Sequence, residues 1–145
     1  MEYRKSNENF YLRIDKGEEV FAAVRNLCEK ENIKSAHFQG IGGCGDITVA
    51  TLNSDAKTFT DHNVKDKVIE MVSLLGNVSF GNDDNLHLHA HALFSYIDED
   101  NKPAVIAGHL KEAIILFTGE IVLTPANFVI ERQFDKNAGI EVWKL

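Results

Sequence analysis

Apolar and polar residues alternate along most of this chain, and only one segment shows the spacing of a helix. Residues 10–14 (Phe-Tyr-Leu-Arg-Ile) alternate as expected of a half-buried strand. Residues 18–31 instead place apolar side chains at helical intervals, which predicts an amphipathic helix of about four turns. These apolar positions are Val20, Phe21, Val24, Leu27 and Cys28. Glu18 and Glu19 are expected in the first turn, where they favour the helix dipole, and Asn32 is expected to end the helix.

The chain after this helix is predicted to be almost wholly β-structure. Short segments rich in β-branched and aromatic residues follow one another, separated by glycine or by polar turns. The predicted strands are residues 35–39, 46–52, 57–61, 67–75, 77–80, 86–97, 104–109, 114–117, 120–123, 128–134 and 140–143. Four of the six residues from 40 to 45 are glycine, which suits a bulge or a tight bend between two strands.

The composition is that of one globular domain spanning residues 1–145, with 44% hydrophobic and 26% charged residues. No apolar run reaches the roughly 20 residues that a membrane span requires. The first residues lack the apolar core of a signal peptide, so we expect a cytoplasmic protein with no membrane contact. Cys28 and Cys44 are too few for a disulfide framework, and we expect them to be buried free thiols.

The charge of the chain argues against a nucleic-acid partner. Fifteen basic residues stand against 22 acidic ones, which gives a formal charge of −7. Proteins that bind DNA usually present a basic stripe, because contacts to phosphates supply most of their non-specific affinity. The densest basic group here, Lys57, Lys65 and Lys67, is interleaved with Asp61 and Asp66. DNA binding is therefore not supported by the charge.

The segment 86–94, Leu-His-Leu-His-Ala-His-Ala-Leu-Phe, carries the most specific chemical signal. His87, His89 and His91 are spaced two residues apart, and His109 follows in an Ala-Gly-His-Leu segment. Alternate residues of a strand point to one face, with about 6.5–7 Å between their Cα atoms. Three imidazoles therefore project from one side. Neutral imidazole is a preferred ligand of zinc, so this row predicts a divalent metal site, with zinc the expected ion.

The hairpin that joins residues 86–97 to residues 104–109 sets which histidines can share an ion. A tip centred near Asp100 places His109 opposite His91, whereas a tip near Glu99 places it opposite His89. Either register puts His109 on the histidine face. The outer pair, His87 and His91, lie roughly 13–14 Å apart at Cα, which is awkward for one ion. We therefore expect His89 and His109 in the site, with His87 and His91 as alternatives for the third ligand.

The alternative to a metal site is a polar or subunit-facing strip, in which the imidazoles bond carboxylates or backbone groups. Three histidines in register, joined by a fourth across a hairpin, favour the metal. An open coordination position would hold water or a small ligand, and metal-bound water can be activated for hydrolysis. No general base or nucleophile is identifiable, so the sequence assigns no catalytic residue. Glu112 could accept a hydrogen bond from behind a ligand histidine.

Five segments in this order resemble the PPC (or PCC) domain, the plants and prokaryotes conserved family. They are Gln-Gly-Ile-Gly at residues 39–42, Val-Ser-Leu-Leu-Gly at 72–76, His-Leu-His-Ala-His at 87–91, Gly-His-Leu-Lys-Glu-Ala at 108–113 and Glu-Ile-Val-Leu at 120–123. The resemblance spans nearly the whole chain. It implies an α+β fold, with a mainly antiparallel sheet carrying one principal helix, assembled as a homotrimer. Prokaryotic members of the family stand alone and are often labelled DNA-binding proteins.

The resemblance matches the prokaryotic pattern at His89, His91 and His109, with His87 as an additional histidine. It does not extend to the Arg-Gly-Arg core of an AT-hook, which plant members carry and this chain lacks. The hairpin over residues 94–106 looks several residues longer than is usual in the family, and Ala107 stands where members often have glycine. The histidine pattern and the resemblance together predict a metal-binding domain, trimeric as the resemblance implies, with a small-ligand or regulatory role, and DNA binding as the alternative.

Overall fold

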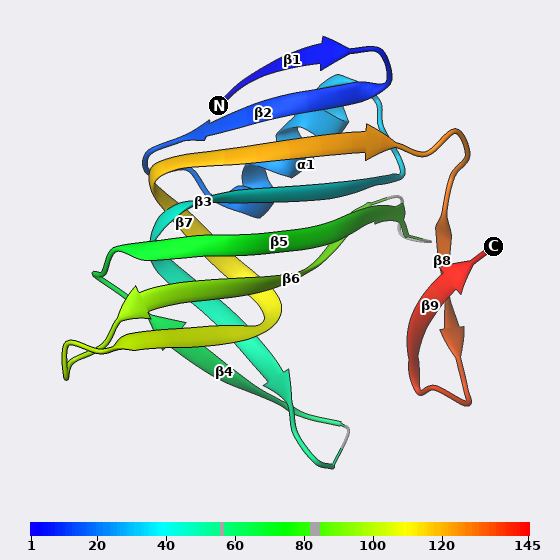
Figure 1. The fold of residues 1–145 in the computed structure, drawn as a ribbon. Coiled ribbons are helices and arrows are strands. Elements are labelled where there is room, and N and C mark those ends of the chain that lie inside the picture. Colours follow the sequence, from blue (N-terminus) through cyan, green and yellow to red (C-terminus); the bar gives the residue numbers. More distant parts are fainter. Residues whose placement is uncertain (56, 82–84) are drawn as a thin grey trace.

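The computed structural model describes residues 1–55, 57–81 and 85–145, which form one helix and nine strands (Figure 1). The elements in chain order are β1 (Glu2–Ser6), β2 (Asn9–Asp15), α1 (Val20–Lys30), β3 (Ala36–Leu52), β4 (Phe59–Val64), β5 (Ile69–Phe80), β6 (Leu86–Ile97), β7 (Pro103–Pro125), β8 (Glu131–Asp135) and β9 (Ile140–Lys144). The fold is thus mainly β with a single helix, and the predicted α+β class describes it only roughly.

All nine strands belong to one sheet, and four of them close on themselves. The main path runs β1-β2-β7-β3-β5-β8-β9, and β4 pairs with β3. Strand β6 pairs with both β5 and β7, while β7 also pairs with β3 and β3 with β5. These pairings make a closed circuit of β3, β5, β6 and β7, so none of these strands can shift without breaking a second ladder.

The helix covers one side of the sheet, which we call the inner face (Figure 1). Val20, Val24, Leu27 and Cys28 of α1 are buried in the same core as the inward side chains of the strands. The helix begins at Val20 rather than at Glu18, because the Glu19 carboxylate accepts hydrogen bonds from the backbone N–H groups of residues 21 and 22. Glu19 is therefore the N-cap, and the prediction that both acidic residues lie in the first turn is wrong.

Two rows of paired residues show how the strands divide side chains between the faces. Residues opposite one another in antiparallel strands share a face. The inner row runs Leu12, Ile121, Gly40, Leu74, Ala92 and Gly108. The outer row, one residue along, runs Tyr11, Val122, Gln39, Leu75, His91 and His109. We call the side of the sheet that carries this second row the outer face; it lies away from α1.

Three strands are longer than predicted, because segments that were expected to separate strands continue the ladder instead of ending it. Strand β3 runs through residues 40–45 with bulges between Gly40 and Gly42 and again before Cys44, so the glycines bend one strand rather than separating two. Strand β5 continues through Gly76, since the ring of Phe38 occupies the space that a side chain there would need. The predicted segments 104–109, 114–117 and 120–123 are all parts of β7.

Other predictions agree closely with the structure. Strand β6 has the predicted bounds, and the Asn32 backbone takes a positive φ of 53° just beyond the helix, as a stop residue does. Cys28 and Cys44 are buried free thiols, and burial raises the pKa of each to about 12. Strand β1 was not predicted. Within the described ranges, no helix is both long enough and apolar enough to cross a membrane.

Candidate metal centre

Two neighbouring strands bring three histidines together on the outer face. His89 and His91 lie on β6, and His109 lies on β7 directly opposite His91. The register is the one that the tip near Asp100 predicts, because paired residue numbers sum to 200 along this ladder. His87 and His91 were the two alternatives for the third histidine beside His89 and His109, and this register places His91 in the group.

The turn between β6 and β7 holds that register through one aspartate. The Asp98 side chain accepts hydrogen bonds from the backbone N–H groups of Asp100 and Lys102, each at 2.9 Å. The Asp98 N–H donates to the Lys102 carbonyl at 2.9 Å, and Asn101 adopts a positive φ of 60°. Asparagine tolerates this left-handed conformation better than most residues. The turn residues therefore specify a tip at which only one pairing of the two strands fits.

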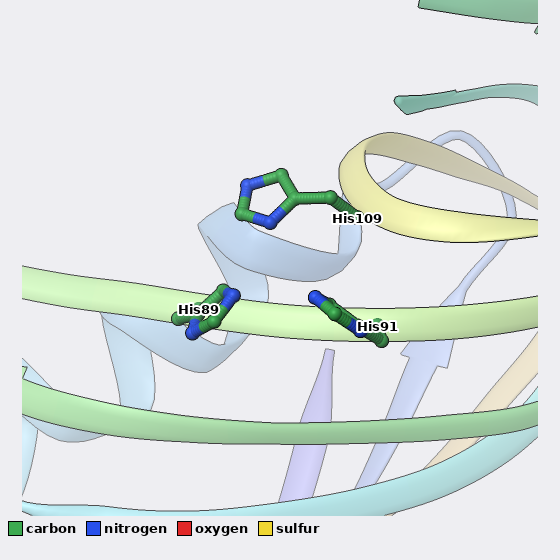
Figure 2. A group of neighbouring side chains, drawn as sticks. All are labelled: His89, His91 and His109. Carbon is green, nitrogen blue, oxygen red and sulfur yellow. The ribbon is translucent and has the colours of Figure 1, made fainter. Parts of the chain in front are cut away.

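The three imidazole rings face a common space (Figure 2). Ring centroids are 4.9 Å apart for His89 and His109, 5.2 Å for His89 and His91, and 5.6 Å for His91 and His109. One ring nitrogen from each of the three can be chosen so that all lie within 4.8 Å of one another. No other described residues of the chain form such a group of three histidine, cysteine or carboxylate ligands.

This arrangement fits a tetrahedral zinc ion. Zinc–nitrogen bonds of about 2.0–2.1 Å place ligand nitrogens about 3.4 Å apart in a tetrahedron. The three nitrogens lie within 4.8 Å of one another, which is wider than this value, and rotation about the two side-chain bonds of each histidine is the movement that would bring them onto one ion. Three nitrogen ligands would leave one coordination position open, as in catalytic rather than structural zinc sites.

The remaining histidines lie outside this group. His87 lines the same pocket as the three but is not one of them. His37 is exposed on β3, and His62 on β4 lies with its Nε2 at 3.1 Å from the Thr51 hydroxyl. Glu112 is exposed, and no hydrogen bond joins it to His109 among the described residues, so the role expected for it behind a ligand histidine is not seen.

The surroundings of the site favour uncharged imidazoles. Burial lowers the pKa of His89, and the nearby His109, His91 and Arg132 lower it further. Burial also lowers the pKa of His109, helped by His91 and Lys111. A histidine binds metal only as the neutral base, since its donor nitrogen must be free of a proton. His89 and His109 therefore stay neutral, and able to bind a metal cation, at pH values where an ordinary histidine begins to take up a proton.

A pocket of about 650 Å³ opens beside the three histidines. Its walls include Leu52, Phe59, Arg132, Ile140 and Glu141. The Phe59 ring lies 5.8 Å from the His109 ring. None of these five residues was predicted from the sequence, because the end of β3, the start of β4 and the β8–β9 hairpin meet at the pocket only in the folded sheet. No spacing along the chain relates residue 132 to residue 89.

The chain belongs to the Plants and Prokaryotes Conserved (PCC) domain family, whose sequence profile matches residues 1–127. That match covers both strands of the histidine site and ends before the β8–β9 hairpin. The recognition of this family from the sequence is thereby confirmed. No curated protein sequence matches the chain significantly.

Solved structures share the fold over almost the whole chain. A candidate DNA-binding protein from Bacteroides thetaiotaomicron is 26% identical, with a TM-score of 0.86 over 99% of this chain and 96% of its own. A metal-containing protein from Archaeoglobus fulgidus is 26% identical, with a TM-score of 0.82 over 99% and 97% of the two chains. A plant- and prokaryote-conserved protein from Pyrococcus horikoshii is 29% identical, with a TM-score of 0.78 over 99% and 94%.

The substitution Gly108→Ala should disturb the site through the backbone. A Cβ atom at residue 108 would lie 2.5 Å from the Ala50 carbonyl oxygen, so β7 would have to move away from β3 next to His109. We expect a loss of about 1–3 kcal/mol in the free energy of unfolding and weaker metal binding. Chemical denaturation and metal titration would measure these effects. Gly45→Ala is the matched control, because its Cβ would meet Leu116 at an ordinary 3.6 Å; equal effects of the two substitutions would contradict this account.

The metal-free protein should lose stability as the pH falls below 6.5. The folded state lowers the pKa of His89 and His109 from their ordinary value of 6.5, so the unfolded chain binds protons first. The loss begins near 6.5 and is complete below the folded-state pKa values. Urea unfolding between about pH 8 and pH 5 would measure it. The double variant His89→Ala, His109→Ala should show a shallower dependence, and an unchanged slope would refute the assignment.

Proposed function

We propose that the protein binds one divalent metal ion per chain, zinc in preference to harder cations, through His89, His91 and His109. The observation that carries this proposal is the convergence of three ring nitrogens within 4.8 Å at the edge of a pocket. Imidazole suits zinc and its neighbours, whereas magnesium and calcium prefer oxygen ligands. The description of the Archaeoglobus relative as metal-containing supports the same conclusion.

The ion would hold a small ligand at its open position. Three protein ligands beside an open pocket are the arrangement of zinc sites that bind or transform a molecule, rather than of sites that only hold a fold together. The pocket walls give that ligand both apolar and charged surroundings. The role that follows is sensing or processing of a small molecule by a metal-dependent module.

The outer face would be the surface on which copies of this chain assemble, as a homotrimer in keeping with the family resemblance. Tyr11, Ile41 and Leu75 are 50%, 55% and 60% exposed there, around a hollow of about 710 Å³ that Val122 also lines. Exposed apolar side chains gathered around one hollow are typical of a surface that binds another protein. Leu75 lies directly opposite His91, so the assembling surface and the metal site are neighbours.

DNA binding is the competing function, because relatives of this fold carry that description. The arrangement of charges does not favour it. Lys67 pairs with Glu99 at 2.7 Å and Lys111 with Asp61 at 2.6 Å, so acidic partners offset these lysines. The net charge of −7 opposes approach to a polyanion.

Metal content tests the central proposal. Protein purified without a nickel column should contain about one zinc per chain, measured by elemental analysis. His89→Ala with His109→Ala should lower zinc affinity by more than about 100-fold, because loss of a residue that only hydrogen-bonds to a metal ligand already lowers metal affinity about 10–100-fold. His37→Ala with His62→Ala removes two histidines elsewhere on the sheet and should leave zinc content unchanged. Zinc that persists in the first double variant would exclude this site.

Light scattering tests the assembly. The protein should elute with about three times the mass of one chain, and Leu75→Glu should give monomers because it buries a charge in the proposed interface. Val68→Glu changes a similarly exposed side chain, at 56%, that lies between β4 and β5 rather than in the rows of the outer face, and should leave the trimer intact. A monomeric unaltered protein would contradict the proposal.

A gel-shift series across salt concentrations separates metal binding from DNA binding. We expect no shifted complex even at the lowest salt, where electrostatic affinity is greatest. Tight binding that weakens steeply with added salt would instead support the DNA-binding function.

A further inference from the structure

The β8–β9 hairpin adds a wall to the histidine pocket from outside the part of the chain that matches the family profile, which ends at residue 127. It stands at one end of the sheet (Figure 1), where β8 pairs with β5 through Phe80 and Glu131. Ile140 and Glu141 of β9 and Arg132 of β8 line the pocket together with His89, His91 and His109. The hairpin therefore adds three side chains to the pocket that do not belong to the histidine group.

Among the residues that the structure describes, Arg132 is the one lysine or arginine that lines this pocket, and several contacts hold its side chain. Its side chain is only 16% exposed. One terminal nitrogen donates to the Ser79 hydroxyl at 3.3 Å and the other to the Glu141 carbonyl at 2.9 Å. The Glu141 carboxylate lies 3.7 Å from its Nε and is half exposed. The guanidinium is thus anchored from both strands of the hairpin and from β5.

This guanidinium and the three histidines line the same pocket, so its positive charge lies next to the candidate metal site. A fixed positive charge beside a cation site is unfavourable for metal binding by itself, since like charges repel. An anion bound between the metal ion and the Arg132 guanidinium would be attracted to both. A carboxylate is the anion whose shape best matches a planar guanidinium.

The other walls indicate how large and how polar that anion is. Leu52, Phe59 and Ile140 give the pocket an apolar surface. A phosphate could bind both the ion and the guanidinium, but it gains nothing from the apolar walls. A carboxylate with a short hydrocarbon chain uses both the guanidinium and the apolar surface.

We propose that the open position of the metal site takes a small aliphatic carboxylate, whose charge Arg132 recognises and whose hydrocarbon part lies against Leu52, Phe59 and Ile140. This inference rests on the proposed metal site and names the class of ligand for it. Glu141 then acts as a modulator: its carboxylate competes with the ligand for the same guanidinium.

Cobalt(II) substitution tests the two proposals separately. Cobalt bound by three histidines has a visible spectrum that changes when a ligand enters the open position, so metal binding and carboxylate binding are read independently. Isobutyrate is the probe and isobutyramide its uncharged control. We expect isobutyrate to alter the spectrum of the unaltered protein and isobutyramide to leave it unchanged.

Variants assign the effect to the hairpin. Arg132→Gln should weaken isobutyrate binding on the order of tenfold or more, since it removes a charge-assisted hydrogen bond. Arg132→Lys keeps the charge and should fall between. Glu141→Gln should tighten binding, because it removes the competing carboxylate. Arg4→Gln is the matched control at an exposed arginine on β1 and should change nothing.

The outcomes are distinguishable. Failure of the unaltered protein to bind cobalt overturns the metal site itself. Cobalt binding with the same isobutyrate affinity in all variants overturns only the assignment of Arg132. Loss of cobalt affinity in Glu141→Gln would make Glu141 a metal ligand and would also contradict the proposal. If Arg132→Gln disturbs the hairpin enough to lose cobalt, tighter binding by Glu141→Gln supports the proposal, and unchanged binding there refutes it.

Discussion

The antiparallel register between β6 and β7 is the constraint on which the candidate site depends. Because side chains alternate between the faces of a strand, a slip of one residue would send His109 to the inner face and leave His89 and His91 without a third ligand. The Asp98 turn fixes this register locally. The closed circuit of β3, β5, β6 and β7 fixes it a second time, since each of these strands is held by two neighbours. A metal site built on a two-stranded ribbon alone would have no such second restraint.

The division of the sheet into two faces explains why the site lies where it does. The helix supplies the apolar cover that the inner face requires, so the core is complete on that side. The outer face keeps polar and apolar side chains in one row, from Tyr11 through Leu75 to His91 and His109. Assembly of copies over the apolar part would lower the polarity around the histidines and strengthen their preference for the neutral form. Metal binding and association would then favour each other.

The site could be predicted as far as it is local in sequence. The spacing of His89 and His91 fixes their common face, and a hairpin centred at Asp100 places His109 opposite His91. The full length of the long strands was harder to predict. At Gly76, for example, the strand continues because the Phe38 ring occupies the space beside the glycine, and this contact is visible only in the folded structure. Arg132 and Glu141 could not be predicted at all. They reach the pocket through the β8–β9 hairpin. That hairpin contacts β5 where Arg132 bonds to Ser79 and Glu131 pairs with Phe80, and the partners in each contact are some fifty positions apart in the chain.

X-ray absorption at the zinc edge of the purified protein tests the central claim most directly, because it reports the ligands of the ion itself. The account predicts three imidazole nitrogens at about 2.0–2.1 Å, with the multiple-scattering features of histidine and one further light-atom ligand. His91→Ala should reduce the imidazole number by one. A shell containing sulfur at about 2.3 Å, or a shell of oxygens without imidazole scattering, would contradict it.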